Sequence, residues 1–461
     1  MSATGNDAAG SRVHRPRRLV ALARFRMFLL RTPPARLLVA GYLSYVLIGW
    51  GLLMLPVAQE HPVGAIDGLF IAASAISTTG LATVDTGTSF TFWGELVVLL
   101  LIQAGGLGYM TIGSFAYLSL SRRLSGLRVH TTRATFGLPS TISPAVFIRS
   151  VVLFTLFVEA AGAFALTVMF YHRGVPDFLW QAIFHSVSSF CTAGFSLFAT
   201  SMEAYKADPA VLLTISALSI LGSVGFLIVV DIWAWTVGRA ARLGFTSIVI
   251  LKMTAWLIGV GTVVVVIADP VIAAMPLGTR LLNGFFQAMT ASTTVGFNTV
   301  PVGQMGIAAL FALIVLMLIG ASPAGTGGGF KTTSAAVLAA LVRSTLRGRG
   351  QVQLYGQAIS EDRVHLDASA FAYYLSAMSL ALFALLIVDP GATFEATLFE
   401  AVSAMSTVGL SMGMTGSLSD AGKLIVTFLM FAGRVGFLTF GVAIALRNRT
   451  AVRLPETDLV L

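Results

Sequence analysis

The stretch 77–81, Ser-Thr-Thr-Gly-Leu, is the first of four related segments that decide the fold of this chain. The others are 191–195 (CTAGF), 293–297 (TTVGF) and 406–410 (STVGL). Each contains Thr-x-Gly followed by a large apolar residue, and successive glycines are 114, 102 and 113 residues apart. Similar segments at nearly constant spacing along the whole chain indicate an internal repeat. The sequence therefore predicts four copies of one structural unit.

Apolar stretches flank all four segments, and each has about the 20 residues that a helix needs to cross a bilayer. The stretch just before each glycine is shorter, about 13 residues, and cannot span a membrane as a helix. The predicted unit is therefore a spanning helix, a re-entrant pore helix with its loop, and a second spanning helix. Several of the pore helices are expected to begin at an N-cap: Asp67, Asp177, Thr279 or Thr393. The eight predicted spans are 37–56, 91–118, 146–171, 208–236, 246–275, 304–320, 368–388 and 421–446.

The composition supports a membrane protein and excludes several other classes. Of 461 residues, 56% are hydrophobic and 11% charged, and the mean hydropathy is +0.87. A soluble globule of this composition would lack the polar residues to cover its surface. The single cysteine, Cys191, excludes an intramolecular disulfide, and the six histidines lack zinc-site spacing. No nucleophile with a base or metal set lies on the spans, so the chain is not expected to be an enzyme.

The positive charges predict the orientation. Lys and Arg gather at both ends and between the repeats, where 24 of the 29 lie, whereas the outer connections carry acids. The positive-inside rule then places both termini in the cytosol of a multi-pass plasma-membrane protein, with no nucleic-acid partner. The basic start lacks a cleavage site and is interpreted as an arm that faces membrane lipid. The predicted domains are the arm 1–36, repeats at 37–121, 146–237, 246–345 and 368–446, and a cytosolic tail at 447–461.

The chemistry of Thr-x-Gly suits a cation that has lost its water. Backbone carbonyls and threonine hydroxyls replace hydration oxygens without fixed charge, and glycine permits the positive φ that aims successive carbonyls alike. Non-helical backbone at this depth is tolerated where it lines a wet path. Four such segments around a pseudo-fourfold central pore would form a selectivity filter; the alternative is a set of ordinary helix-breaking loops. The predicted ion-binding residues are Thr78, Thr79, Gly80, Thr192, Ala193, Gly194, Thr294, Val295, Gly296, Thr407, Val408 and Gly409.

Over nearly its whole length the chain resembles the membrane subunits of the Trk/Ktr/HKT superfamily of K⁺ transporters. The resemblance lies in the four segments, in 103–110 (QAGGLGYM) and in 320–333 (GASPAGTGGGFKTT), and the Ktr type (KtrB-like) fits better than the longer TrkH type. It implies K⁺ uptake, with Na⁺ dependence left open, by a homodimer with one pore per protomer. It also implies control by a cytosolic nucleotide-binding RCK-type subunit similar to KtrA or TrkA. In the family a glycine at every filter position accompanies K⁺, so Gly80 favours K⁺ over Na⁺.

A glycine-rich stretch at 320–331 is predicted to break the sixth span inside the membrane, because Pro323 and its glycines do not sustain a helix. The resemblance implies that this stretch is a flexible loop that obstructs the pore. A plain hinge is the alternative. A phosphate-binding loop is disfavoured because Phe330 interrupts GxxxxGK[ST] and no strand precedes it. The predicted gate residues are Gly325, Gly327, Gly328, Gly329, Lys331 and Arg434.

Arg434 is the only cation assigned to the interior of a predicted span. Its family counterpart implies an electrostatic barrier in the pore, against a structural ion pair or carbonyl clamp. Glu159 is interpreted as a packing contact rather than a transport site, Asp231 as a partner of Arg239 or a cap, and His185 as structural. Cys191 departs from the Ser or Thr of the other segments and is expected to alter permeation without abolishing it.

The function predicted from these features is K⁺ translocation without a covalently bound cofactor. An Na⁺ or mixed-cation transporter of the same fold is the nearest alternative. A solute symporter is disfavoured because it would show inverted repeats, whereas these four run the same way. Channel-like conduction and Na⁺-coupled symport remain open.

Overall fold

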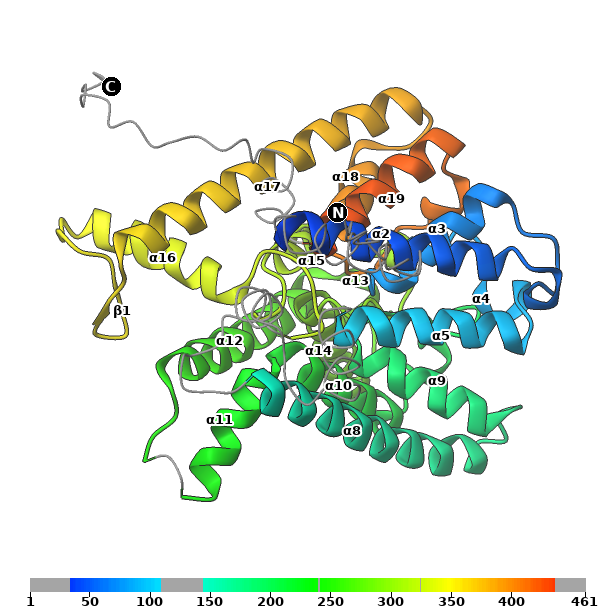
Figure 1. The fold of residues 1–461 in the computed structure, drawn as a ribbon, viewed down its shortest axis with the longest axis horizontal. Coiled ribbons are helices and arrows are strands. Elements are labelled where there is room, and N and C mark those ends of the chain that lie inside the picture. The colour runs from blue at the N-terminus through cyan, green and yellow to red at the C-terminus, as the bar shows by residue number, and fades with distance from the viewer. Residues whose placement is uncertain (1–33, 109–143, 239–240, 324, 436–461) are drawn as a thin grey trace, which may run out of the picture.

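The computed structural model describes residues 34–108, 144–238, 241–323 and 325–435. Several predicted parts lie outside the described residues: the arm up to residue 33, the end of the second span (109–118) with the connection that follows it, Arg239, and the end of the last span with the tail 447–461. The described part is mostly helical, which confirms the all-α class (Figure 1). It holds one small sheet, an antiparallel pair of β1 (Gln353–Leu354) and β2 (Gln357–Ala358) that the sequence did not predict.

The helices fall into four consecutive groups, each with a short helix that ends at a Thr-x-Gly segment. Group 1 has α2 (Pro34–Leu53), α3 (Ala65–Ile76), α4 (Thr86–Ser89) and α5 (Phe92–Leu107). Group 2 has α8 (Pro144–His172), α9 (Phe178–Phe190), α10 (Pro209–Val224) and α11 (Phe226–Thr236). Group 3 has α12 (Phe245–Ala268), α13 (Pro270–Ala273), α14 (Leu277–Thr293), α15 (Ile307–Leu318) and α16 (Thr332–Leu346). Group 4 has α17 (Glu361–Val388), α18 (Phe394–Met405) and α19 (Asp420–Val435).

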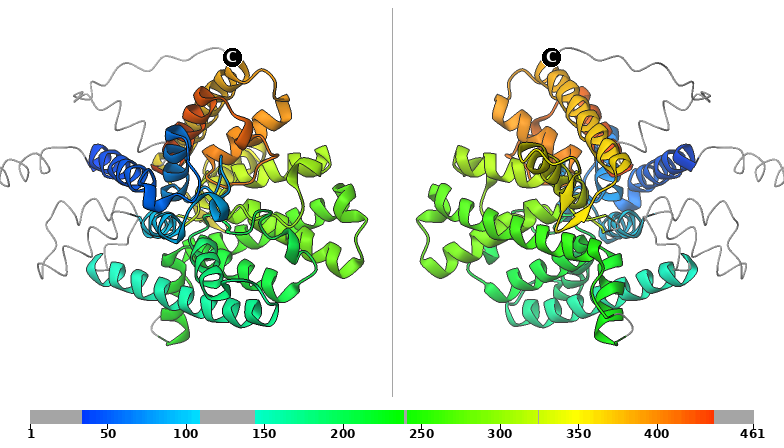
Figure 2. Two further views of the ribbon diagram at one scale, coloured as in Figure 1. Left: turned by 90° about the vertical axis from the view of Figure 1, so that its right-hand side faces the viewer. Right: turned by 90° about the vertical axis from the view of Figure 1, so that its left-hand side faces the viewer.

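The groups contact one another in a closed order. Helix α5 packs on α9, α10 on α14, and α15 on α18, and then α19 packs on α3 of the first group. In each contact the helix after one Thr-x-Gly segment meets the short helix of the next group. Figures 1 and 2 show the blue group 1 between the orange group 4 and the teal group 2, as this order requires.

Long apolar helices cover the outside. Three described helices, Arg149–His172, Phe245–Ala268 and Glu361–Val388, are long and apolar enough to cross a membrane. Large apolar side chains on them point outward; Phe157 is 73% exposed and Leu380 71%. Apolar surface of this extent is unfavourable in water and favourable against lipid.

Several helix ends differ from the sequence prediction. Only Thr393, of the four expected caps, accepts a backbone hydrogen bond, from Ala396 N at 3.3 Å. Asp177 stands at the start of α9 without a side-chain bond to it, and Asp67 and Thr279 lie inside the first turns of α3 and α14. The stretch 208–236 is not one helix, because Gly225 adopts a φ of 101° between α10 and α11.

Candidate functional site

Each Thr-x-Gly segment leaves its short helix through the same turn. The backbone N–H of the middle residue bonds to the carbonyl oxygen five residues earlier in all four segments, at 2.8 to 3.1 Å: Thr79 to Ser74, Ala193 to Ser188, Val295 to Thr290 and Val408 to Ser403. This 6→1 bond marks a helix end whose next residue is left-handed. The C-terminal ends of α3, α9, α14 and α18 therefore all lead into the segments, and such ends carry partial negative charge that favours a cation.

Four threonines occupy the left-handed backbone region. The φ angles are 51° at Thr78, 51° at Thr192, 60° at Thr294 and 50° at Thr407. A threonine in this region costs on the order of 1–3 kcal/mol, so surrounding contacts must enforce it. The sequence predicted positive φ for glycine alone. Threonine at these positions adds a side-chain hydroxyl that glycine would lack.

The structure brings the four segments together in a ring through their glycines. A Cβ on Gly80 would lie 2.4 Å from the carbonyl oxygen of Ala193, and one on Gly194 2.3 Å from that of Val295. The same contact runs from Gly296 to the Val408 oxygen and from Gly409 to the Thr79 oxygen, at 2.0 Å in each case. The order is 1, 2, 3, 4 and back to 1. The middle carbonyl of every segment thus lies against the glycine of the preceding one.

Three glycines on the helices that follow the segments, Gly105 in α5, Gly222 in α10 and Gly433 in α19, lie behind the same turns. A Cβ on Gly105, Gly222 or Gly433 would meet the carbonyl oxygen of Ile76, Phe190 or Met405, respectively, at 1.8 to 2.2 Å. These three carbonyls belong to equivalent residues, one before each C-cap. These glycines therefore permit a close approach of the helices, as small residues do between membrane helices.

The loop 319–331, between α15 and α16, lies against the threonine side of the ring. Thr326 Oγ1 donates to the carbonyl oxygen of Phe190 (3.0 Å) and accepts from Thr192 Oγ1 (3.2 Å). Gly328 N donates to Thr294 Oγ1 at 3.0 Å. A Cβ on Gly328 would lie 2.0 Å from Thr407 Oγ1. The loop thus contacts threonines of three groups.

Two cations hold this loop. Lys331 Nζ donates to the carbonyl oxygen of Gly327 at 2.8 Å. Arg434 donates to the carbonyl oxygens of Thr326 and of Gly105. Arg434 is thus a carbonyl clamp between the loop and group 1, and none of the ion pairs among the described residues includes it. The clamp keeps the guanidinium next to the loop.

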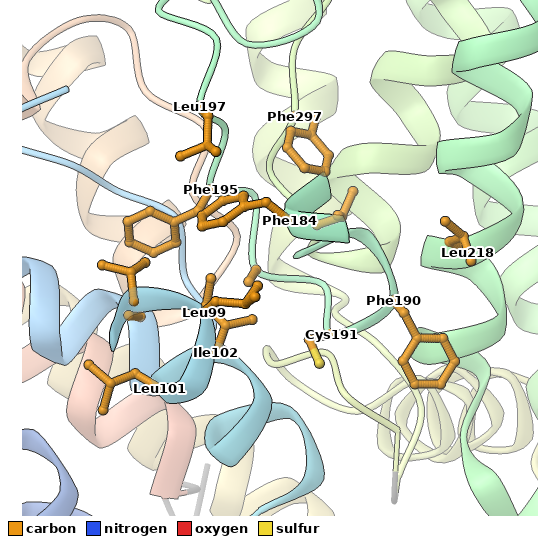
Figure 3. Packing of buried hydrophobic residues seen from close by; sticks show 14 of the residues in the cluster. Leu99, Leu101, Ile102, Phe184, Phe190, Cys191, Phe195, Leu197, Leu218 and Phe297 are labelled. Carbon is orange, nitrogen blue, oxygen red and sulfur yellow. The ribbon is translucent and has the colours of Figure 1, made fainter. Parts of the chain in front are cut away.

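The other residues singled out from the sequence have ordinary partners. Glu159 is 5% exposed, and its Oε1 lies 3.5 Å from Cys191 Sγ, directly behind the second segment. Asp231 accepts from Gly244 N at 2.6 Å and so caps the start of α12. Figure 3 shows Cys191 at the end of α9 next to Phe190, among the buried apolar side chains.

Sequence reasoning missed three side chains that touch this region. Tyr374 Oη lies 2.7 Å from Ser406 Oγ, and Tyr374 stands 32 residues before Ser406, as Glu159 stands before Cys191. Thr326 lay within the predicted loop but was not assigned a contact. Lys423 pairs with Asp67 across groups 4 and 1 at 2.8 Å. The matched 32-residue spacing in the sequence could have predicted the Tyr374–Ser406 contact. No pattern in the sequence predicts the Asp67–Lys423 pair.

The Asp67–Lys423 ion pair joins group 4 to group 1, and its loss is expected to destabilise the fold. Both side chains are mostly buried, with 20% and 13% of their surface exposed. Lys423→Met should lower the free energy of unfolding by about 1–2 kcal/mol, between the values of exposed and buried pairs. Thermal unfolding in detergent measures this. The exchanged pair Asp67→Lys with Lys423→Asp should recover part of the loss, and equal losses in the single and exchanged variants would contradict the pairing.

Comparison with known proteins identifies the family. The family model TrkH, described as cation transport protein, matches residues 44–451. Ktr system potassium uptake protein B of Vibrio alginolyticus is 34% identical over 440 residues, covering 92% of this chain and 94% of the relative. The protein of the same name from Bacillus subtilis is 33% identical, covering 93% and 97%. Potassium/sodium uptake protein NtpJ of Enterococcus hirae is 30% identical, covering 94% and 98%.

Among solved structures, the potassium transporter TrkH from Vibrio parahaemolyticus matches with a TM-score of 0.69. The match covers 88% of this chain and 85% of that one, at 19% identity, and therefore supports the fold alone. The resemblance predicted from the sequence, including its Ktr-type character, is confirmed by the family model and the relatives. Since the family model covers most of its length, the chain belongs to the TrkH family of cation transport proteins and is a multi-pass membrane transporter rather than an enzyme.

Proposed function

We propose that the chain is the pore-forming subunit of a K⁺ uptake system in the plasma membrane. Its four groups act as pseudo-fourfold repeats of span, pore helix and span, with eight spans in all. The four Thr-x-Gly segments form the selectivity filter. The observation that carries this proposal is the cyclic contact in which each glycine lies against the middle carbonyl of the next segment.

The proposed filter works through oxygen ligands. Carbonyls of the middle residues and the glycines, with the threonine hydroxyls, replace the hydration shell of a K⁺ ion. The converging helix ends add a negative potential without a carboxylate that would bind the ion too tightly. Thr78 Oγ1 and Thr407 Oγ1 are buried without a hydrogen-bond partner, which supports a role as ion ligands.

The loop 319–331 acts as the gate. Its contacts to Thr192, Thr294 and Arg434 support a closed position against the inner end of the filter. Release would require a force from outside the membrane. We infer that this force comes from a cytosolic RCK-type nucleotide-binding subunit, on a homodimer with cytosolic termini. The similarity to Ktr-type uptake proteins supports this assignment.

A mixed K⁺/Na⁺ transporter is the second candidate, because one relative is named a potassium/sodium uptake protein. The K⁺ proposal has the stronger support, since two relatives at 33 and 34% identity are named potassium uptake proteins. Coupling of K⁺ uptake to Na⁺ is compatible with either candidate.

The test is growth of a K⁺-uptake-deficient bacterial strain at low K⁺, with the chain expressed alone and with a Ktr- or Trk-type cytosolic subunit. The proposal expects growth to be restored, and more strongly with the cytosolic subunit. Uptake of ⁸⁶Rb⁺ in competition with K⁺ and Na⁺ identifies the ion. Equal competition by Na⁺ would favour the mixed transporter, and no restored growth in either setting would contradict K⁺ uptake.

A further inference from the structure

One position on the four short helices lies seven residues before the threonine of each segment. It holds Ile71, His185, Gln287 and Glu400. All four side chains are fully buried. Buried polar groups need hydrogen-bond partners, and the two ionisable members, His185 and Glu400, both find them beyond their segments.

His185 holds the chain just beyond the second segment. Its Nδ1 lies 2.7 Å from the carbonyl oxygen of Gln181, which can only accept, so Nδ1 carries the proton. Its Nε2 then accepts from Ser196 Oγ at 3.0 Å. Ser196 is the second residue after Gly194, and its oxygen also accepts from Phe198 N at 2.9 Å.

Glu400 does the same beyond the fourth segment. Its Oε2 accepts from Ser411 Oγ at 2.8 Å, and its Oε1 accepts from Thr415 Oγ1. Ser411 is the second residue after Gly409, and its oxygen accepts from Gly413 N at 3.1 Å. As in group 2, a serine hydroxyl joins the short helix to the backbone N–H two residues further on.

Groups 1 and 3 lack this tie. The position of the serine is occupied by Ala82 in group 1 and by Asn298 in group 3. Asn298 Nδ2 instead donates to Glu203 Oε1 of group 2 at 2.9 Å. In the closed order of the groups, 2 and 4 are not neighbours and so face each other across the ring. The serine tie to this helix position therefore occurs in groups 2 and 4, on opposite sides of the ring. Groups 1 and 3 have other links to their short helices: Gly80 N donates to Ser74 Oγ at 3.1 Å, and Gln287 Nε2 donates to the Val300 carbonyl oxygen at 3.5 Å.

We propose that the pairs His185–Ser196 and Glu400–Ser411 are positioning pairs that fix the width of the ion path and so set the discrimination between K⁺ and Na⁺. The inference rests on the proposed K⁺ function. None of these four residues has to touch the ion. Each serine holds the strand that follows a filter glycine, and the position of that strand fixes where the glycine carbonyl points. A strand freed from its tie can shift inward toward the radius that suits a smaller ion.

The test removes one hydroxyl at a time, which leaves the buried imidazole and carboxyl in place. Ser196→Ala, Ser411→Ala and the double variant are expressed as the full chain, and ⁸⁶Rb⁺ uptake is measured against K⁺ and Na⁺. The KM for K⁺ should rise, and Na⁺ should compete more strongly, each by about tenfold, the effect of one hydrogen bond to a buried ionisable group. Ser411→Thr keeps a hydroxyl and should retain wild-type discrimination. Ser376→Ala, on the exposed face of α17, is the matched control.

Protein amount and thermal unfolding are measured for every variant. Glu400→Gln serves as a second probe of group 4, because the amide oxygen of glutamine can still accept a hydrogen bond from one hydroxyl. If the Ser196→Ala and Ser411→Ala proteins discriminate between K⁺ and Na⁺ as well as the Ser376→Ala control does, the inference is overturned, and the proposed K⁺ uptake is not affected. A fall in maximal rate with unchanged discrimination would also overturn it, since that is the result of a structural role. A wild type without K⁺ uptake would overturn the proposed function and this inference together.

Discussion

Gly296→Val is expected to lower K⁺ uptake by at least about 100-fold, which corresponds to about 2.7 kcal/mol. A Cβ at this position would lie 2.0 Å from the Val408 carbonyl oxygen, and the φ of 85° is one that β-branched residues avoid. The backbone must move, so the third and fourth segments lose their mutual position. Growth at low K⁺ and ⁸⁶Rb⁺ uptake at matched protein amount measure the loss.

Gly51→Val provides the matched control for this prediction. Gly51 also lies on the described chain, in α2, but a Cβ there would meet nothing within 4 Å. Valine in a helix costs only a few tenths of a kcal/mol to about 0.7 relative to alanine, so uptake should stay near the wild-type rate. A well-folded Gly296→Val protein with unchanged K⁺ selectivity would show that the glycine ring is not the filter.

Arg434→Gln is expected to raise the K⁺ flux, by about tenfold if one charge-assisted hydrogen bond restrains the loop. The substitution removes a positive charge from the proposed ion path and weakens the bonds to the Thr326 and Gly105 carbonyls. Both effects act in the same direction, because the charge repels the ion and the bonds hold the loop against Thr192 and Thr294. Flux into proteoliposomes without a cytosolic subunit measures the change.

Arg434→Lys separates the two effects. It keeps the charge and loses the forked geometry that reaches two carbonyls at once. If charge dominates, the lysine variant should conduct like the wild type; if the clamp dominates, it should conduct like Arg434→Gln. Unchanged flux in a folded Arg434→Gln protein would contradict a role of this arginine in the pore.

The sequence predicted the helical class and the family because both depend on residue patterns that can be read directly from the sequence. Each of the four Thr-x-Gly segments lies at a similar distance from its flanking apolar stretches, and most Lys and Arg residues lie at the ends of the repeats. Gly105, Gly222 and Gly433 also lie at similar distances after the segments, 25, 28 and 24 residues beyond Gly80, Gly194 and Gly409. Their partners, the carbonyls of Ile76, Phe190 and Met405, became known only from the packing.

Other features depend on contacts between residues far apart in the chain. The left-handed threonines could not be predicted, because threonine avoids that region unless the fold enforces it. The clamp role of Arg434 needed the position of Thr326, 108 residues away. His185 was interpreted as structural and Glu400 was passed over, although both occupy the same position relative to their segments and both precede a serine two residues after the glycine. The signal in the sequence is the shared spacing of His185 and Ser196 with Glu400 and Ser411, 11 residues in each case.

The central claim is that a dehydrated K⁺ ion binds on the axis between the four segments. Anomalous diffraction from crystals grown in Tl⁺, which substitutes for K⁺, tests it directly. The account predicts anomalous peaks equidistant from the carbonyl oxygens of Thr79, Ala193, Val295 and Val408, which K⁺ displaces and an equal concentration of Na⁺ does not. Tl⁺ peaks elsewhere in the protein, with none between these four carbonyls, would contradict it.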